Sequence, residues 1–427
     1  MSYALLISGL LLGYAILAWR DLRVALLVLT GLLPTYLLRF TVGPIPTTAL
    51  EVMILITLAA WVIKGDAKGL LRFARNDEEI KKWAMPALLL LAAACFGVVV
   101  APDVFGALGI WKAYFVEPML VAVMMLTVLK KDDWTWIVRT LAVSALVVSI
   151  IAILQYLSGL GIPTPWDIER RVTGIFEYPN ALGLYLVPIV TLLAVHLASS
   201  LRGAKRRSNL LWDCVATLAM TSGLAAIILA KTEAALVAIP AALFLIFLLS
   251  GAPKRMKWRV AGELFIVFIL LIAMIPTVRE KLFLQDHSGQ VRLSQWSETT
   301  QLLLDHPAFG AGLNAYPQAL APYHDDTLYE IFQYPHTLIF NIWTELGLLG
   351  LVAFFWLAWL VIRSVHPSVT QRLNDSTTLP IFAALLTMSI HGLVDVPYFK
   401  NDLAMLTWVL IAGLILQTKT SAPRKRS

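Results

Sequence analysis

Three segments of the sequence contain residue types that could stabilise an anionic leaving group and take up a proton. Arg292 lies in VRLSQW, and its guanidinium offers a planar fork of donors that suits phosphate oxygens. The imidazole of His336 has an ordinary pKa of about 6.5, so it can accept a proton near neutral pH. Lys231 lies in AKTE, the polar break in an apolar stretch from about 214 to 250. Each cation could instead snorkel to lipid phosphates or cap a helix.

A further segment, RRVTGIFEYPN, carries Arg171 just before an apolar run. Pro179 and Asn180 are typical of the start of a helix, and a helix N-terminus attracts anions. Arg171 could therefore contact an anion, or it could pair with Glu177 and only order the loop.

His336 stands just before the segment TLIFNIWTELGLLG. At 100° per residue, His336, Trp343, Gly347 and Gly350 fall within about 40° of one helix face. Because glycines allow close helix contact, we expect this face, His336 included, to point into a helix bundle. Glu345 falls roughly opposite and would need a partner if buried. A histidine at a helix end is more often structural.

Other polar residues are expected to support these groups. Trp296 would anchor a surface helix at the level of lipid headgroups. His391 and Asp395 are four residues apart, so on a helix the carboxylate could orient the imidazole.

The composition excludes a soluble protein. Of the 427 residues 59% are hydrophobic and only 14% are charged, with a mean hydropathy of +0.76, whereas soluble domains are about 25% charged. Two cysteines exclude a disulfide scaffold, and the net charge of +7 comes from residues between the apolar runs, which indicates membrane orientation and no nucleic acid. The sequence contains no P-loop, HExxH or CxxC motif.

The apolar runs predict an all-α polytopic membrane protein with about 12–14 transmembrane helices and one long extracytoplasmic loop containing short helices. We divide the chain into N-terminal transmembrane helices (1–160), a membrane region (161–418) that includes the loop 278–335, and a basic cytoplasmic tail (419–427). The thirteen runs lie at about 3–19, 24–39, 47–63, 84–100, 107–128, 135–157, 180–197, 212–229, 232–250, 260–277, 337–362, 380–395 and 402–418.

The basic residues set the orientation. Alternate connections hold 24 of the 34 Lys and Arg, and the positive-inside rule assigns them to the cytoplasm. The N-terminus is then outside and the long loop extracytoplasmic. Arg139 lies just inside a helix. Nine cations remain outside, against the rule: Arg39, Lys112, Arg170, Arg171, Lys231, Arg279, Lys281, Arg292 and Lys400. We expect several of these nine cations to have a specific role at their own position on the outer side.

The long loop contains a helical pattern. Leu293, Trp296, Thr300 and Leu303 recur at helical spacing, and the proline and glycines over 307–312 end it. We expect an amphipathic helix on the outer membrane surface.

Taken in order, the segments resemble the bacterial O-antigen ligase/O-antigen polymerase family. They are RVTGIFEYPNALG, the AKTE turn, VRLSQW with HPAFGAG, HTLIFNIWTELGLLG and HGLVDVPY. The resemblance covers about 165–415, while the first 160 residues match only as hydrophobic spans.

The resemblance implies a polytopic lipid-linked glycan transferase without a metal or nucleotide cofactor, in the bacterial cytoplasmic membrane. Such enzymes transfer a glycan from a polyprenyl diphosphate, usually undecaprenyl diphosphate, to an acceptor hydroxyl. In the ligases two arginines and a histidine form the functional centre. One arginine matches Arg292, the histidine matches His336, and Lys231 occupies the place of the second arginine, which keeps the charge but loses the bidentate fork.

The residues suggest compatible chemistry. Arg292, Lys231 and Arg171 could stabilise the diphosphate as the anomeric bond breaks, and His336 could deprotonate the acceptor or contact the diphosphate as imidazolium. Two alternatives remain: a polymerase of the same family, with another acceptor, and a transporter, which would place charges or unwound helices near the bilayer midplane.

Overall fold

The computed structural model describes residues 2–66, 78–202, 210–250, 252–274, 276–325, 329–365 and 377–418. Its first half contains α1 (Ser2–Arg20), α2 (Leu22–Gly31), η1 (Leu33–Leu37), β1 (Arg39–Val42), β2 (Ile45–Thr48), α3 (Ala49–Ile63), α5 (Glu78–Val100), α6 (Val104–Trp111), η2 (Lys112–Val116), α7 (Glu117–Val128), η3 (Lys131–Asp133), α8 (Trp134–Ser158) and α9 (Pro179–Arg202).

In the second half, the elements of the described part are all helices. It contains α10 (Leu210–Leu229), α11 (Glu233–Leu249), α12 (Lys254–Met274), α13 (Pro276–Leu282), α14 (His287–Asp305), α15 (Tyr316–Leu320), η4 (Ala321–Tyr323), α16 (Leu338–Val365), α18 (Thr378–His391) and α19 (Asn401–Thr418).

The protein is an all-α polytopic membrane protein, as the composition predicts. In the described part of the chain, seven helices are long and apolar enough to cross a membrane, and five shorter apolar helices of 10–17 residues accompany them. The long loop contains the predicted helix as α14, together with α13 and α15. Every predicted apolar run contains a helix, although the boundaries differ at three places that matter for the site.

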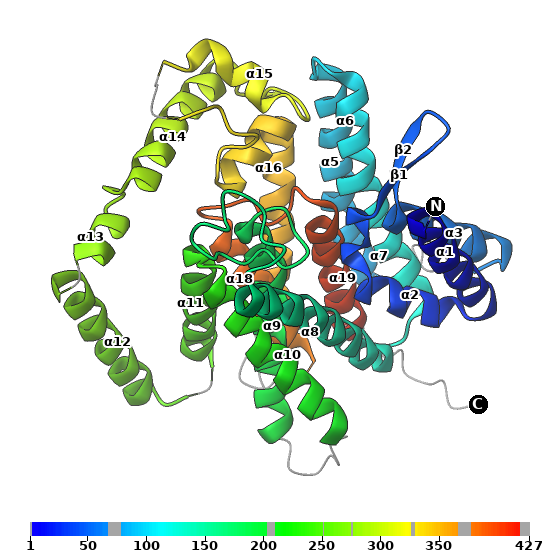
Figure 1. Cartoon of the computed structure of the whole chain (residues 1–427), viewed down its shortest axis with the longest axis horizontal. Helices are drawn as coiled ribbons and strands as arrows, with labels where there is room; N and C mark the ends of the chain where they lie inside the picture. Colours follow the sequence, from blue (N-terminus) through cyan, green and yellow to red (C-terminus); the bar gives the residue numbers. More distant parts are fainter. Residues whose placement is uncertain are drawn as a thin grey trace.

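The first difference is the run at 24–39, which does not form one span. Here α2 ends at Gly31, Pro34 begins the short 3-10 helix η1, and Arg39 starts a two-stranded hairpin. In this antiparallel pair Arg39 faces Thr48 and Val42 faces Ile45. The hairpin projects beyond the helices at one end of the molecule (Figure 1).

The other two differences lie near the predicted site. α16 begins at Leu338, after His336, and is interrupted at Gly347, whose φ of 66° and ψ of −170° are not helical. α18 ends at His391, so Asp395 lies beyond the helix.

The core of the bundle surrounds α9 and α19. About 78% of the apolar window of each is buried inside the protein. α9 packs against α10 and α18, α19 packs against α7, and α5 packs against α16. α12 stands to one side and packs mainly against α13 (Figure 1).

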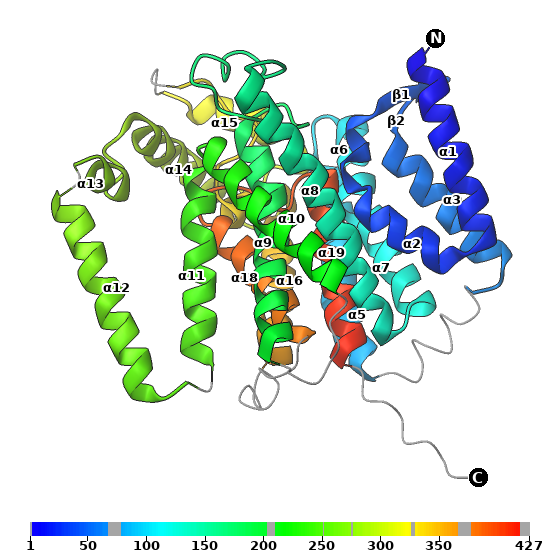
Figure 2. The same ribbon diagram turned by 60° about the horizontal axis from the view of Figure 1, so that its bottom comes forward.

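The two ends of the bundle differ in character. At one end Arg23 Nε donates to Asp133 (2.6 Å) and Lys131 Nζ donates to the carbonyl of Gln417 (3.1 Å), which gathers basic residues near the end of α19. The other end carries the hairpin, α14 and α15 (Figure 2). The predicted basic tail 419–427 and the basic residues within 67–77, 203–209 and 366–376 lie outside the described residues.

Candidate functional site

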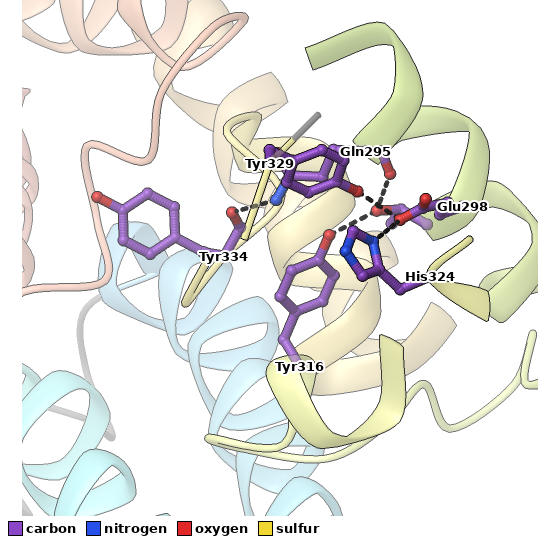
Figure 3. Close-up of polar contacts among 7 residues, drawn as sticks. Gln295, Glu298, Tyr316, His324, Tyr329 and Tyr334 are labelled. Carbon is purple, nitrogen blue, oxygen red and sulfur yellow. Dashed lines mark hydrogen bonds and ion pairs between the residues drawn. The ribbon is translucent and has the colours of Figure 1, made fainter. Parts of the chain in front are cut away.

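α14 holds the backbone of the segment that carries His336. Gln295 Nε2 donates to the carbonyl of Tyr334 (3.0 Å), and Trp296 Nε1 donates to the carbonyl of Pro335 (2.9 Å). Figure 3 shows the Tyr334 carbonyl facing Gln295 while the phenol ring points away from α14. In this structure Trp296 therefore fastens the loop before His336, although the sequence predicted an anchor at the lipid headgroups.

α14 also binds the loop on its other side. Glu298 accepts a hydrogen bond from Tyr329 and lies 3.1 Å from His324 Nδ1, and the hydroxyls of Thr299 and Tyr316 are 2.7 Å apart (Figure 3). The helix therefore buries Gln295, Glu298 and Thr299 against the loop. Of the predicted pattern, Leu303 is buried while Leu293 and Thr300 are exposed, and the membrane-surface position of the helix stays a prediction.

His336 does not lie on a helix face. It precedes α16 in a loop and has a positive φ of 48°. Its ring lies between two aromatic rings, with centroids 4.9 Å from Phe332 and 5.2 Å from Tyr334, both edge-on. The predicted shared face with Trp343, Gly347 and Gly350 is thus wrong, because the helix starts too late and breaks at Gly347.

Arg292 is close enough to His336 to affect its protonation. Burial and the positive charge of Arg292 lower the pKa of His336 from 6.5 to about 4, since both disfavour the imidazolium. Burial raises the pKa of Asp395 to about 6, opposed by a hydrogen bond from the Val396 amide and by the charges of Arg292 and Lys400. The structure therefore brings Arg292, His336 and Asp395 together.

Lys400 completes what we call the central cluster: Arg292, His336, Asp395, Lys400, Tyr178 and Tyr334. Its ammonium lies 4.9 Å from the ring centroids of both Phe176 and Tyr178. Burial lowers the pKa of Lys400, opposed by nearby carboxylates. The hydroxyl of Tyr334 interacts with that of Tyr178, which links this lysine to the ring beside His336.

Arg171 and Lys231 form a separate pair, which we call the turn cluster. Arg171 Nε donates to the carbonyl of Ala230 (3.2 Å), and its guanidinium lies 4.9 Å from the centroid of the Trp166 ring. Lys231 Nζ donates to the carbonyl of Glu169 (3.0 Å). The predicted alternative of an Arg171–Glu177 pair is not formed, since Arg171 binds the turn itself. Each cation thus fastens the other's loop.

The turn cluster sits beside the first turns of α9. Thr232 packs so closely on Gly183 that a Cβ there would lie 2.9 Å from the Thr232 hydroxyl. Asn180 is half-buried in the first turn of α9. Lys281 of α13 pairs with Glu233 at the start of α11, so this turn lies at the same end as the loop helices.

The break in α16 is closed by residues 308–312 of the long loop. At the break, the carbonyl of Thr344 accepts hydrogen bonds from two amides of the loop in place of one within the helix. The donors are Ala311 (2.7 Å) and Gly312 (3.2 Å). In exchange, the amide of Leu348 donates to the carbonyl of Ala308 (3.0 Å). A Cβ on Gly347 would lie 2.3 Å from that same oxygen. The break therefore leaves neither the Thr344 carbonyl nor the Leu348 amide without a hydrogen-bond partner.

The same loop supplies the partner that Glu345 requires. The buried carboxylate accepts from the amide of Asn314, with 2.7 Å between the two atoms. Gly310 and Gly347 thus serve the contact between this loop and α16, whereas the sequence predicted helix-to-helix contact for Gly347.

The predicted His391–Asp395 pair is not supported by a shared helix face. α18 ends at His391, and Asp395 Oδ1 accepts from the amide of Val396 (2.8 Å). Both side chains are buried. Asp395 instead belongs with Arg292 and Lys400.

An apolar cavity of about 370 Å³ lies next to the central cluster, between α16, α18 and α19. Leu338, two residues after His336, lines it together with Gly392, and the Leu338 amide donates to the Gly392 carbonyl (2.8 Å). A chain of apolar groups in this cavity would therefore end beside His336.

Residues 217–355 match the family model described as O-antigen ligase. This region is therefore similar to the O-antigen ligase family. The match supports a membrane glycosyltransferase of the O-antigen ligase/polymerase type. No curated protein matches the chain.

The O-antigen ligase region includes Lys231, Arg292, His336 and the whole break in α16. Two parts of the central cluster lie outside it: Tyr178, before α9, and the segment from Asp395 to Lys400. Sequence reasoning missed Tyr178 and Lys400 as site residues. Lys400 was among the nine cations that oppose the positive-inside rule, and this position could have pointed to it as a site residue. Among the described residues, no group of three or more His, Cys, Asp or Glu is arranged to hold a metal ion.

Proposed function

We propose that the chain transfers a glycan from a polyprenyl diphosphate carrier, such as undecaprenyl diphosphate, to an acceptor hydroxyl. The observation that carries this proposal is that His336, which the charge of Arg292 affects, stands two residues before Leu338, and Leu338 lines an apolar cavity. A cation can stabilise the diphosphate, a neutral imidazole can accept the proton of the acceptor hydroxyl, and the apolar cavity can hold the prenyl chain.

In the proposed reaction the acceptor oxygen attacks the anomeric carbon and inverts it. The bond from that carbon to the diphosphate oxygen breaks, and the electron pair stays on the diphosphate. Arg292 stabilises the negative charge that develops there. The acceptor proton passes to a ring nitrogen of His336, whose low pKa keeps it neutral before the step.

Lys231 and Arg171 are the proposed outer part of the diphosphate clamp. The side chain of Lys231 is 55% exposed and lies 3.9 Å from the Glu169 carboxylate, so the ion pair is weak and the ammonium can exchange it for a phosphate. Trp296 and Asn180 are proposed to support the site by fixing the His336 loop and the first turn of α9.

We place this reaction at the outer face of the bacterial cytoplasmic membrane. The support is the distribution of basic residues: the end of the bundle with Arg23 and Lys131 carries the predicted cytoplasmic set, and the site lies at the other end.

The break in α16 does not favour the alternative of a transporter. Unwound helices in transporters present free carbonyls to an ion, whereas the Thr344 carbonyl is bound by Ala311 and Gly312. A polymerase of the same family remains the alternative, since only the acceptor differs.

The test uses membranes containing the protein, a polyprenyl-diphosphate glycan and candidate acceptors, with glycan transfer and carrier release as readouts. We expect His336→Ala to slow transfer about 10²–10⁴-fold and Arg292→Ala about 10²–10³-fold. His287→Ala and Arg279→Ala are matched controls in the same loop, because both residues are exposed. The product distinguishes a ligase from a polymerase. Normal transfer by both site variants would refute the assignment.

A further inference from the structure

A second cavity, which we call the hairpin pocket, lies at the base of the β1–β2 hairpin. It has a volume of about 650 Å³ and opens between the hairpin and the residues around η2. Its lining combines polar and apolar groups, and the side chains used below are Tyr36, Arg39, Glu51, Lys112 and Asn401. A volume of this size suits a small ligand or a few sugar units.

The pocket gathers two of the nine cations that oppose the positive-inside rule. Lys112 pairs with Glu51, so this ammonium is already compensated. Arg39 is exposed and, among the described residues, forms no ion pair with a carboxylate. Its guanidinium is therefore available to an anion.

A buried hydroxyl also lacks a partner at this pocket. Tyr36 is only 2% exposed, and its hydroxyl forms no hydrogen bond with any described residue. A buried polar atom without a partner is unfavourable, because it has lost its hydrogen bonds to water. A ligand hydroxyl or anionic oxygen in the pocket would satisfy it.

The hairpin pocket adjoins the central cluster through Lys400. The ammonium of Lys400 lies 5.8 Å from the centroid of the Tyr36 ring and 4.9 Å from that of Tyr178. Tyr178 interacts with Tyr334, whose ring centroid is 5.2 Å from that of His336. Asn401, next to Lys400, lines the pocket itself. A ligand seated here thus lies along a chain of polar contacts that ends at His336.

We propose that the hairpin pocket binds the acceptor, and that this acceptor is a glycan carrying an anionic group, either a phosphate or a carboxylate. The proposal rests on the transfer function proposed above. Arg39 binds the anionic group, and the Tyr36 hydroxyl donates a hydrogen bond to a neighbouring oxygen. The apolar cavity between α16, α18 and α19 and the hairpin pocket share no lining residue, so donor and acceptor would have separate binding places, as transfer between two bound glycans requires.

The test measures binding without donor, so it does not depend on transfer. Purified full-length protein in nanodiscs is titrated calorimetrically with three trisaccharides: one with a phosphate monoester, one with a carboxylate and the neutral parent. We expect the wild type to bind one anionic probe at least tenfold more tightly than the parent. Arg39→Gln should weaken that probe about tenfold or more and leave the parent unchanged, since it removes a charged hydrogen bond.

Two further variants complete the test. Tyr36→Phe keeps the ring and should weaken the anionic probe several-fold, while Arg279→Gln, an exposed arginine outside the pocket, should bind like the wild type. Thermal melting checks that each variant is folded. Equal affinity for the three probes, no binding of any probe at 10 mM (roughly a −2.7 kcal/mol threshold), or unchanged binding by Arg39→Gln would overturn the proposal. Failure of the transfer assay alone would not, because binding is measured without donor.

Discussion

At the scale of single residues, the proposed chemistry depends on the protonation state of His336. Arg292 and burial both act against the imidazolium and hold the pKa of His336 near 4. The sequence left open whether this histidine acts as a base or contacts the diphosphate as a cation. The neutral form at physiological pH favours the base.

The pH profile of transfer tests this role. A neutral His336 is active above its pKa, so the rate of the wild type should fall only as the pH drops through about 4. Arg292→Gln removes a charge that opposes protonation, so the pKa of His336 should rise and the acidic limb should move up with it, while burial, the larger cause, keeps the pKa below 6.5. Histidine-labelled protein followed by NMR titration gives the same pKa without turnover. Arg279→Gln is the control, and an acidic limb near 6.5 in the wild type would contradict the assignment.

Lys231 provides a second test at this scale. If it joins the clamp, Lys231→Gln should lower kcat about 10²–10³-fold, because one charge-stabilising donor is lost at the leaving group. Lys231→Arg keeps the charge and adds the fork, so it should retain activity. Glu169→Gln is the control: it removes only the weak pair with the Glu169 carboxylate and keeps the backbone carbonyl that Lys231 binds, so it should retain activity. Activity of Lys231→Gln equal to that of the wild type would restrict the lysine to holding its loop.

From residue type and order in the chain, the sequence analysis predicted Arg292 and His336 as site residues. It did not predict that Lys400 and Tyr178 would be their neighbours. Tyr178 and Tyr334 come from segments more than 150 residues apart, and only the packing of α9, α14 and α19 brings them together. Periodicity assigns a residue to a face of its own element. It does not say which element covers that face.

At the scale of elements, the hydrophobic runs predicted the helices because burial in lipid requires internally bonded backbone. They did not predict the interruption at Gly347. Its spacing from Gly350 suggested a helix partner, whereas the structure places the backbone of Ala308 and Phe309 against it. Likewise, a purely apolar run at 24–39 gave no sign of the turn at Pro34 or of the hairpin that follows.

Gly347→Ala tests this docking of loop and helix. The new Cβ would meet the Ala308 carbonyl at 2.3 Å, and the positive φ of 66° is itself unfavourable for alanine by about 1–2 kcal/mol. We expect a lower melting temperature and reduced transfer, because the loop that carries α14 loses its attachment to α16. Gly13→Ala is the matched control, since nothing lies within 4 Å of a Cβ there. Unchanged melting of Gly347→Ala would show that the loop is held elsewhere.

At the scale of the whole molecule, the two ends of the bundle have different tasks. One end gathers Arg23, Asp133 and Lys131 around the end of α19. The other carries the central cluster, the hairpin pocket and the loop helices (Figure 2). The count of basic residues in the connections predicted this division, because the rule depends on charge alone and not on how the helices pack.

Cysteine labelling tests which end faces outward. In a variant with Cys95 and Cys214 replaced by alanine, Thr41→Cys reports on the hairpin and Asp132→Cys on the basic end, and both positions are exposed. Basic connections stay in the cytoplasm, so an impermeant maleimide should label Thr41→Cys in intact spheroplasts and Asp132→Cys only after lysis. Retained transfer shows that each variant is folded, and labelling after lysis shows that each cysteine is reactive. The reverse pattern would put Arg292 and His336 at the cytoplasmic face, where the donor would have to be used before it crosses the membrane.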